Sequence, residues 1–361
     1  MDKTKVLIAM SGGVDSAVAA LLMQEQGHGC VGITMRLFDN EDAGVSSRTC
    51  CSLEDAEEAE RVANRLGIPF YVFNFSDDFR KRVIGRFVEE YQRGATPNPC
   101  IDCNRFIKFE RLFERAVRLG MDYVVTGHYA RVEFYNGRYL LKKGADASKD
   151  QSYVLYAMTQ EQLSRTLFPL GGMTKAEARA LAARRGFSNA EKPDSQDICF
   201  VPNGDYAEFI TRYSGEECPD GDYIDTAGNV LGRHKGHIRY TIGQRKGLAI
   251  ALGKPMFVCA KNASANTVTL CEGDELYSRE LYAEDFNWIT FDDLGENEIR
   301  VKAKIRYNQK EQPATVRLAE GGRVHIVFDE PQRAIAAGQA VVLYDGDIVV
   351  GGGTIRSCSE S

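Results

Sequence analysis

The sequence has no apolar stretch long enough to cross a membrane as a helix. None of its apolar runs approaches the roughly 20 residues that such a helix needs. The first residues, Met1 to Lys5, lead straight into a strand-like run, so the pattern of a secretory signal peptide is also missing. With 361 residues, 43% of them hydrophobic and 27% charged, the composition is typical of a soluble globular protein with two or three domains. We therefore expect a cytoplasmic protein that does not contact membranes.

Acidic residues are absent from one long segment, although the chain as a whole is acidic. The net charge of −6 argues against a protein-wide surface for polyanions, so contact with nucleic acid would need a local basic surface. Residues 226–271 contain no Asp or Glu, and a second basic run covers residues 300–310. In that run Lys302, Lys304 and Arg306 recur with a period of two, which predicts one strand face. Both runs have the composition of a phosphate-backbone contact, and a solvated strand face is the simpler alternative.

The order of the predicted elements indicates an α/β protein. Over the first 130 residues, strand-like runs alternate with helical ones, which is typical of a doubly wound, Rossmann-like parallel sheet. The predicted strands are Lys5–Met10, Cys30–Met35, Pro69–Phe75 and Asp122–Thr126. The predicted helices are Ser16–Gln26, a helix capped by Ser52 that ends at Leu66, Asp77–Gln92 and Asn104–Leu119.

The pattern changes after residue 130. Asn136 and Gly137 predict a β-hairpin, and helices are expected over Gln151–Leu167 and Thr174–Arg185, the latter with a capping box. Beyond Pro202, short strands separated by turns predict a small, mostly β central domain and a C-terminal β-barrel. We place the domains at residues 1–200, 201–275 and 276–361. The predicted strands of the last two are Asp222–Asp225, Arg239–Thr241, Met256–Lys261, Thr267–Leu270, Phe286–Phe291, Arg300–Arg306, Ala314–Leu318, Arg323–Phe328, Ala340–Tyr344 and Ile348–Ile355.

The segment Ala9–Ser16, AMSGGVDS, lies between the first predicted strand and the first helix. Its glycines let backbone N–H groups approach a polyanion, and the positive end of the helix points at the same place. Ser11 and Ser16 add hydroxyl donors, while Asp15 can hold a metal ion or fix the loop. No lysine follows the glycines, which excludes the Walker A motif. We expect this loop to bind the pyrophosphate end of ATP, against the simpler alternative of a serine-capped glycine turn.

A second segment, Thr96–Asn104, contains two prolines and delivers Cys103 to the start of a predicted helix. A thiol at a helix N-terminus has a lowered pKa, and nearby basic residues act in the same direction, so Cys103 is a candidate nucleophile. The spacing Cys100-x-x-Cys103 is also compatible with a zinc or iron–sulfur site or with a dithiol redox motif. Adjacent Cys50 and Cys51 are a poorly spaced second pair for a metal.

Three more polar segments are candidates. Ser195–Phe200, SQDICF, contains Cys199, which could be a buried structural cysteine but has polar neighbours that favour a surface loop. Gly127 follows the strand Asp122–Thr126 at the same sheet edge as the glycine loop, where a backbone could approach a nucleotide. His128 beside it could equally be an ordinary structural histidine. Lys149–Tyr153 has the composition of a solvated helix start.

Together these segments resemble one family, the tRNA-specific 2-thiouridylases of bacteria and mitochondria, and the glycine loop resembles that of the ATP pyrophosphatases. The resemblance covers nearly the whole chain and rests on six motifs in order. They are SGGVDS (11–16), TPNPxxxCN (96–104) followed by Ile107-Lys108-Phe109, TGHYAR (126–131), KDQSY (149–153), SQDICF (195–200) and GQRKGL (243–248).

The resemblance implies a two-step reaction on the wobble uridine, position 34, of tRNA. ATP adenylates the C2 oxygen of the base, and a persulfide on Cys199 then supplies sulfur to C2. Cys103 attacks the persulfide and leaves a Cys103–Cys199 disulfide, which a reductant reopens. The products are 2-thiouridine, AMP and pyrophosphate. Magnesium is expected with the ATP, and a cysteine desulfurase or a sulfur-relay carrier is expected as the sulfur donor.

The resemblance also implies which residues contact each substrate. The residues expected to contact ATP are Ala9, Met10, Ser11, Gly12, Gly13, Val14, Asp15, Ser16, Met35 and Gly127. Those expected near the target base are Asn98, Pro99 and Cys100, and those expected to contact the rest of the tRNA are Lys149, Asp150, Gln151, Arg306 and Tyr307. The base must leave the anticodon stack to reach the site. Some members of the family have Asp where this chain has Cys100, so a carboxylate is missing there.

Other functions remain open on the sequence. An ATP pyrophosphatase that uses an amine nucleophile would need neither cysteine nor a basic surface. An iron–sulfur thiolase would use Cys100 and Cys103 as ligands. A non-catalytic tRNA-binding module would have no need for the intact loop at Ser11–Ser16.

Overall fold

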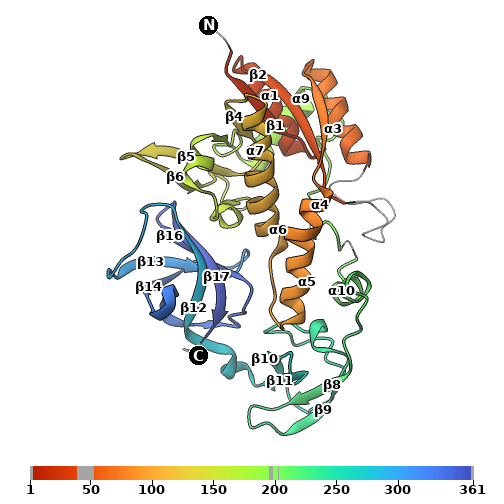
Figure 1. Cartoon of the computed structure of the whole chain (residues 1–361), viewed down its shortest axis with the longest axis vertical. Helices are drawn as coiled ribbons and strands as arrows, with labels where there is room; N and C mark the ends of the chain where they lie inside the picture. The colour runs from red at the N-terminus through yellow and green to blue at the C-terminus, as the bar shows by residue number, and fades with distance from the viewer. Residues whose placement is uncertain (1–2, 39–52, 195–197, 202, 359–361) are drawn as a thin grey trace. The chain divides into compact units, whose positions relative to one another are not determined.

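The protein was described from a computed structural model, which covers residues 3–38, 53–194, 198–201 and 203–358 (Figure 1). The chain divides into two compact units. Unit 1 comprises Met1–Val83, Cys100–Gly204 and Gly346–Val349, and unit 2 comprises Ile84–Pro99, Asp205–Asp345 and Val350–Ser361. The predicted cap Ser52, the pair Cys50 and Cys51, and residues 195–197 of the SQDICF motif lie outside the described residues.

Unit 1 is built on a five-stranded parallel sheet. The strand order is β3-β2-β1-β4-β7, with β1 in the centre. Residues Val6, Leu7 and Ile8 of β1 are fully buried, as expected for a strand covered on both faces. The strands are β1 (Lys5–Ala9), β2 (Gly29–Arg36), β3 (Phe70–Asn74), β4 (Tyr123–Val125) and β7 (Thr166–Leu167).

Helices cover both faces of this sheet. One core cluster joins β1 to α1 (Val14–Glu25), α3 (Leu53–Leu66) and α9 (Lys175–Arg184). A second cluster joins the other face of β1 to α7 (Leu112–Arg118). Figure 1 shows the same division, with α7 on the side of the sheet opposite to α1 and α9. The predicted doubly wound α/β fold is confirmed.

Two long helical runs differ from the sequence prediction in detail. The first, predicted as Asp77–Gln92, consists of α4 (Ser76–Phe79), a π-helical stretch η1 (Arg80–Ile84) and α5 (Gly85–Gln92). The second begins at α6 (Pro99–Asp102), continues as a π-helix η2 (Cys103–Arg111) and ends with α7. The prediction that this second helix starts at Asn104 is wrong. Pro99, which is well suited to the first position of a helix, starts it about one turn earlier.

The region after residue 130 contains one confirmed and one wrong prediction. The hairpin of β5 (Ala130–Tyr135) and β6 (Arg138–Lys143) turns at Asn136 and Gly137, whose φ values are 49° and 82°. The single helix expected over Gln151–Leu167 is wrong. The chain forms a 3₁₀ turn η3 (Ser152–Leu155), the short helix α8 (Gln160–Ser164) and strand β7. A capping box at Thr159 and Gln162 starts α8 afresh, and β7 pairs with β4.

Unit 2 contains a small sheet of order β10-β11-β8-β9. Its strands are β8 (Gly221–Ile224), β9 (Val230–His234), β10 (Phe257–Asn262) and β11 (Thr267–Cys271). The strand expected at Arg239–Thr241 is wrong, because His237–Arg239 forms a 3₁₀ turn, η4. The helix α10 (Tyr206–Ser214) was not predicted, although Asp205 caps its start and Gly215 ends it in a left-handed conformation.

The rest of unit 2 forms the predicted β-barrel. Six antiparallel strands follow the order β12-β15-β14-β13-β16-β17, and pairing of β12 with β17 closes the barrel. Its interior is a cluster of apolar side chains that includes Val316, Ile326 and Leu343. The strands are β12 (Tyr277–Trp288), β13 (Ile299–Lys304), β14 (Gln312–Leu318), β15 (Val324–Arg333), β16 (Ala340–Asp345) and β17 (Ile348–Ser357), with short 3₁₀ turns at Gly273–Leu276 and Glu320–Gly322.

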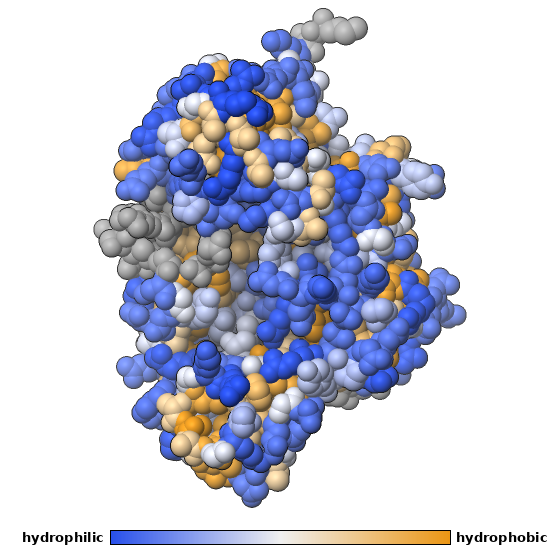
Figure 2. Space-filling view, turned by 180° about the vertical axis from the view of Figure 1, so that it is seen from behind, coloured by the Kyte–Doolittle hydropathy of each residue, from blue (hydrophilic) through white to orange (hydrophobic). Residues whose placement is uncertain are grey.

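The surface is mainly polar where it can be seen. On the face drawn in Figure 2, hydrophilic residues predominate and apolar residues gather in separate patches. Within the described residues, no helix has both the length and the apolar character needed to cross a membrane.

Candidate nucleotide and sulfur-transfer site

The glycine loop connects β1 to α1 at the carboxyl end of the central strand. Gly12 has a φ of 72°, and Gly13 is the N-cap of α1 without any side-chain capping bond. Ser16 Oγ accepts from the N–H of Ser11 at 3.1 Å and donates to Gly13 O at 3.0 Å. In the described part of the chain, the N–H groups of Gly13, Val14 and Asp15 have no acceptor. These free donors at a helix N-terminus form a site suited to phosphate.

The glycines are needed because other backbone lies against the loop. A Cβ at Gly12 would lie 2.4 Å from Asp55 O of α3. A Cβ at Gly127 would lie 2.7 Å from the carbonyl carbon of Asp15 and 2.8 Å from Ser16 N. Gly127 therefore packs directly on the first turn of α1, a contact that the sequence did not predict. Its expected contact with a nucleotide stays a prediction. Met35, also expected at the nucleotide, lies near the end of β2 and is half-buried.

The carboxylate of Asp15 is held by two partners. Tyr129 OH donates to its Oδ1 at 2.8 Å, and Lys175 Nζ donates to Oδ1 at 2.9 Å and to Oδ2 at 2.8 Å. Burial, followed by the charge of Asp15, raises the pKa of Tyr129 well above its ordinary value, so the phenol stays protonated. These contacts agree with the loop-fixing role, one of the two roles that the sequence left open for Asp15.

Metal binding by the protein alone is poorly supported at this loop. Both oxygens of Asp15 already accept hydrogen bonds from Lys175. Across the ranges covered by the structure, no three His, Cys, Asp or Glu side chains are grouped so that they could bind a metal ion. A magnesium ion here would need most of its ligands from water and from the phosphates of the nucleotide.

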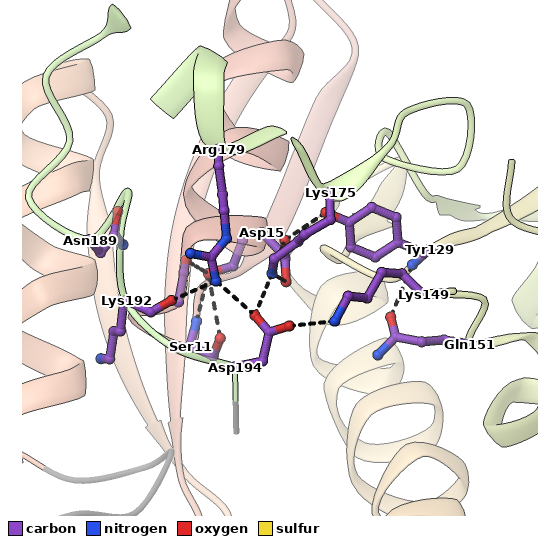
Figure 3. Close-up of polar contacts among 12 residues, drawn as sticks. Ser11, Asp15, Tyr129, Lys149, Gln151, Lys175, Arg179, Asn189, Lys192 and Asp194 are labelled. Carbon is purple, nitrogen blue, oxygen red and sulfur yellow. Dashed lines mark hydrogen bonds and ion pairs between the residues drawn. The ribbon is translucent and has the colours of Figure 1, made fainter. Parts of the chain in front are cut away.

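A second carboxylate, Asp194, gathers three cations beside Asp15 (Figure 3). Its distance to Lys149 Nζ is 2.8 Å, to Lys175 Nζ 2.7 Å and to Arg179 Nη2 3.4 Å. Burial alone would raise the pKa of Asp194, but hydrogen bonds from Lys149 and Lys175 outweigh it and hold this pKa well below its usual range. Asp194 is therefore ionised at all working pH values.

The carbonyl oxygen of Gly12 accepts hydrogen bonds from two side chains that precede Asp194 in the chain. Asn189 Nδ2 donates to it at 3.1 Å and Lys192 Nζ at 3.4 Å, while Lys192 also pairs with Asp55. The amide oxygen of Asn189, which is 3% exposed, accepts no hydrogen bond from the described residues. Such orphaned buried polar atoms are uncommon and call for a ligand, a water or a functional reason.

The sequence did not single out Lys175, Arg179, Asn189 and Lys192 as site residues, and treated Asp194 only as a polar neighbour of Cys199. One signal was present. The capping box at Thr174 and Glu177 fixes the start of α9, so Lys175 lies in its first turn with Arg179 four residues later on the same side. The contact of Lys175 with Asp15, 160 residues earlier in the chain, depends on tertiary folding alone.

Cys103 lies further inside a helix than predicted. It is the fifth residue of the continuous helical run that starts at Pro99, so it does not occupy the N-terminus, and the effect of the helix dipole on its thiol is reduced. It is the first residue of the π-helix η2, and such stretches are frequent at functional sites. Cys103 is half-buried and forms no disulfide, and Cys100 is exposed. The adjacent Asn104, 4% exposed, has an amide oxygen without a partner among the described residues.

Cys199 lies in a turn of unit 1, is half-buried and forms no disulfide. The turn is closed by a hydrogen bond from Val201 N to Ile198 O at 2.9 Å. Phe200 is 1% exposed and packs edge-on against Phe79 with the ring centroids 5.8 Å apart. Burial of Phe200 rather than Cys199 agrees with the prediction of a polar loop. Both candidate thiols thus belong to unit 1.

The sequence left open whether His128 belongs to the site or is an ordinary structural histidine. Its surroundings in the structure are those of a structural histidine. It is 7% exposed, its Nδ1 lies 2.6 Å from Thr126 Oγ1, and its ring packs on Phe109 and Phe168. Burial, followed by the charge of Lys108, lowers its pKa well below the ordinary value, so the ring is neutral.

The residues expected to contact tRNA fall into two groups. Asp150 Oδ1 accepts from Gly144 N at 3.0 Å and from Ser152 N at 3.1 Å, so it holds the backbone on both sides of itself. Gln151 Oε1 accepts from Tyr129 N at 3.0 Å and so supports the segment that follows Gly127. Asn98 is half-buried, Pro99 is buried, and Lys149 is half-buried in its pair with Asp194.

In unit 2, Arg306 lies beyond the end of β13, so it does not continue the strand face of Lys302 and Lys304 as predicted. Its Nη2 donates to Ala334 O at 2.8 Å and Ile242 O at 3.1 Å. Tyr307 is 38% exposed, and Lys304 Nζ lies 5.5 Å from its ring centroid.

The basic segment of residues 226–271 is largely neutralised in space. Arg233 pairs with Asp222 at 2.8 Å and Lys235 with Asp220 at 2.7 Å, and Lys254 pairs with Glu272. Arg245 and Lys246 are exposed and have no ion pair within the described part of the chain. The free positive charge of this segment is therefore much smaller than its composition suggests.

Matches to known protein families extend over nearly the whole chain. Three domain-family models match in succession: "tRNA methyl transferase HUP domain" over residues 4–203, "tRNA methyl transferase PRC-barrel domain" over 207–272 and "Aminomethyltransferase beta-barrel domain" over 278–355. Among solved structures, a 4-thiouridine synthetase–RNA complex with bound ATP is 21% identical, covering 55% of this chain and 45% of that chain, with a TM-score of 0.34. That likeness is too weak to support a functional argument.

Curated relatives match at much higher identity. The tRNA-specific 2-thiouridylase MnmA of Acetivibrio thermocellus is 52% identical over 360 residues, which cover 99% of this chain and 100% of the relative. The tRNA-specific 2-thiouridylase MnmA of Clostridioides difficile is 52% identical over 354 residues, covering 98% of both chains. Although the domain descriptions mention methyl transfer, these full-length relatives carry the thiouridylase name. The chain belongs to the tRNA-specific 2-thiouridylase family.

Proposed function

We propose that this protein replaces the C2 oxygen of the wobble uridine in tRNA with sulfur, at the cost of one ATP. The observation that carries the proposal is the set of free N–H groups of Gly13, Val14 and Asp15 at the start of α1, in a chain about half identical to 2-thiouridylases over nearly its full length. An anion-binding loop is what an ATP-dependent thiolation requires.

In the first step the loop residues Ala9–Ser16, with Met35 and Gly127, hold ATP. The C2 oxygen of uridine attacks the α-phosphorus, and the bond from that phosphorus to the bridging oxygen of pyrophosphate breaks. Pyrophosphate leaves with the electron pair, and AMP becomes attached to the base. The phosphates bring magnesium with them, which supplies charge neutralisation.

In the second step the terminal sulfur of a Cys199 persulfide attacks C2. The Cys103 thiolate attacks the Cys199 sulfur, which breaks the persulfide S–S bond, leaves the outer sulfur on C2 and creates a Cys103–Cys199 disulfide. AMP then departs with the former C2 oxygen, and a dithiol reductant restores both thiols. Both cysteines are half-buried residues of unit 1 and neither is in a disulfide, which supports these roles. A persulfide-carrying donor protein recharges Cys199.

We place the target base beside Asn98, Pro99 and Cys100, at the start of the helical run that carries Cys103. Lys149 and Tyr307 are proposed to contact tRNA directly. Asp150, Gln151 and Arg306 are proposed to act through the backbone that they hold, because their side chains already bind main-chain groups.

The test is nucleoside mass spectrometry of unmodified tRNA incubated with the protein, ATP and a persulfide donor. Wild type should produce 2-thiouridine and AMP. Cys199→Ser and Cys103→Ser should still release pyrophosphate, measured in the same incubation, but form no 2-thiouridine. Cys358→Ser, which changes an exposed thiol, should behave as wild type. Thiolation by Cys199→Ser would contradict the persulfide role. Absence of AMP formation by wild type would contradict the adenylation step.

A further inference from the structure

Five charged side chains meet beside the glycine loop, as Figure 3 shows: Lys149, Lys175, Arg179, Asp15 and Asp194. The three cations and two carboxylates give this cluster a net charge of +1. Lys175 is the central member, because its ammonium contacts Asp15 at 2.8 Å and Asp194 at 2.7 Å while the residue is 8% exposed. One buried cation is thus shared by the loop and by the segment before Cys199.

The two cations of α9 are held in place before any ligand binds. The capping box at Thr174 fixes the first turn, and Lys175 N–H donates to Asp146 Oδ2 at 3.0 Å. Arg179 lies four residues later, and its Nη2 donates to Lys192 O at 3.0 Å and reaches Asp194 at 3.4 Å. In Figure 3 both side chains extend from α9 toward Asp194. Asp194 thereby fixes the direction in which both cations point.

Asp15 places the lysine next to the anion-binding groups. The N–H of Asp15 is one of the free donors at the start of α1. Both oxygens of its carboxylate accept hydrogen bonds from Lys175 Nζ. A phosphate bound at those donors would lie beside the ammonium, and Lys and Arg form strong charge-assisted hydrogen bonds to phosphate.

We propose that Lys175 and Arg179 form the cationic half of the phosphate site, opposite the backbone N–H groups of the loop, with Asp194 as the positioning residue that aims them. The proposal rests on the function proposed above and assigns a further part of its first step. When the bond between the α-phosphorus and the bridging oxygen breaks, negative charge grows on the departing pyrophosphate. Lys175 stabilises that charge more strongly than it stabilises the charge of intact ATP.

A purely structural role is the competing explanation, because the same cations neutralise Asp15 and Asp194. The two roles differ in a double variant. Lys175→Met leaves Asp194 with two cations, Lys149 and Arg179, and lowers the net charge of the cluster from +1 to zero. Adding Asp194→Asn restores the net charge of +1. If Lys175 only balances charge, the double variant should recover both stability and AMP formation. If it acts on phosphate, stability should recover and AMP formation should not.

The experiment measures tRNA-dependent AMP and pyrophosphate formation as a function of ATP concentration, together with thermal unfolding without ligands. The variants are Lys175→Met, Lys175→Arg, Asp194→Asn, the Lys175→Met/Asp194→Asn double variant and Lys142→Met. Lys142 is the matched control, because it is also a lysine of unit 1 bound to two carboxylates, those of Glu133 at 2.9 Å and Asp347 at 3.5 Å.

Lys175→Met should lower kcat for AMP formation about 100- to 1000-fold, with a smaller change in KM for ATP. Lys175→Arg keeps the positive charge and should recover part of the lost kcat. Asp194→Asn should change KM for ATP more than kcat. The control, Lys142→Met, should have the kcat and KM of wild type. Should Lys175→Met fail to fold, Lys175→Arg and the double variant provide the same comparison. AMP formation by the double variant at the wild-type rate would overturn this inference alone. A wild-type protein that forms no AMP would overturn the proposed function and this inference with it.

Discussion

Gly127→Ala is the most direct steric test of the nucleotide loop. Gly127 has an ordinary backbone conformation, so an added methyl group introduces no backbone strain and acts only through contact. That Cβ would lie 2.7 Å from the carbonyl carbon of Asp15 and 2.8 Å from Ser16 N. Both are backbone atoms in the first turn of α1, which cannot move away without shifting the free N–H groups of the loop.

The expected cost follows from the usual penalty for overpacking. Inserting a methyl group into a well-packed site costs about 1–3 kcal/mol, which for a unit of this size corresponds to a fall in Tm of about 2–12 °C. If the displaced turn costs the bound nucleotide a similar amount, the apparent affinity for ATP falls about 5- to 150-fold. Both effects should appear together because one displacement causes them.

The assay compares Gly127→Ala with Gly172→Ala by thermal unfolding and by the ATP dependence of AMP formation. Gly172 also has an ordinary backbone conformation in unit 1, but a Cβ there would meet no atom within 4 Å. We expect Gly172→Ala to match wild type in both measurements. Equal Tm and equal KM for ATP in the two variants would refute the packing of Gly127 on α1 and its place at the nucleotide.

Three further predictions concern other parts of the structure. Lys261 is half-buried, with its Nζ 2.8 Å from Tyr240 O, and partial burial of the ammonium lowers its pKa to about 8. Because the unfolded lysine titrates near 10.4, this group should add about 3 kcal/mol to the free energy of unfolding between about pH 8 and 10.4 and lose it as the pH falls through 8. The difference between wild type and Lys261→Met in denaturant titrations should show this slope, and a flat difference would contradict it. Thr174→Ala removes the capping box with Glu177 and should cost about 0.5–2 kcal/mol in the same titrations, whereas no loss would show that the cap is dispensable. Asp150→Ala leaves the N–H groups of Gly144 and Ser152 without their acceptor and should cost about 1–3 kcal/mol in the absence of tRNA. If Asp150→Ala instead kept the wild-type free energy of unfolding and lost only affinity for tRNA, Asp150 would be a residue of the tRNA-binding surface.

Much of unit 1 could be predicted because local signals determined it. The alternation of strands and helices, the turn at Asn136 and Gly137, and the capping box at Thr174 all depend on neighbours within a few residues. The glycine loop belongs to the same class, since its free N–H groups follow from a strand, a glycine turn and a helix in succession. One error in unit 1 was an error of boundary, at Pro99, where a residue suited to a helix start places the helix earlier than expected for Cys103. The other was an error of element type, over residues 151–167, where one helix was expected and a 3₁₀ turn, a short helix and a strand are found.

The features that sequence reasoning missed depend on partners far away in the chain. Residues 226–271 contain no acidic residue, yet Asp220, Asp222 and Glu272 just outside the segment neutralise three of its cations. Strand β7 is only two residues long, so its pairing with β4 leaves no periodic pattern in the sequence.

The cluster around Lys175 illustrates the same limit at the candidate site. Asp15 and Lys175 are 160 residues apart, and only the packing of α9 against α1 brings them together. A helix start with Lys175 and Arg179 on one side could be read from the sequence, but the carboxylates facing them could not.

The chemistry proposed here depends on a bond that forms between two particular sulfur atoms. Protein carrying a persulfide on Cys199 should be mixed with ATP and unmodified tRNA without reductant, quenched with an alkylating reagent after one turnover, digested and examined by mass spectrometry. One equivalent of a disulfide-linked pair of peptides containing Cys103 and Cys199 is expected for each 2-thiouridine formed. Formation of 2-thiouridine with both cysteines recovered as alkylated thiols would contradict the mechanism.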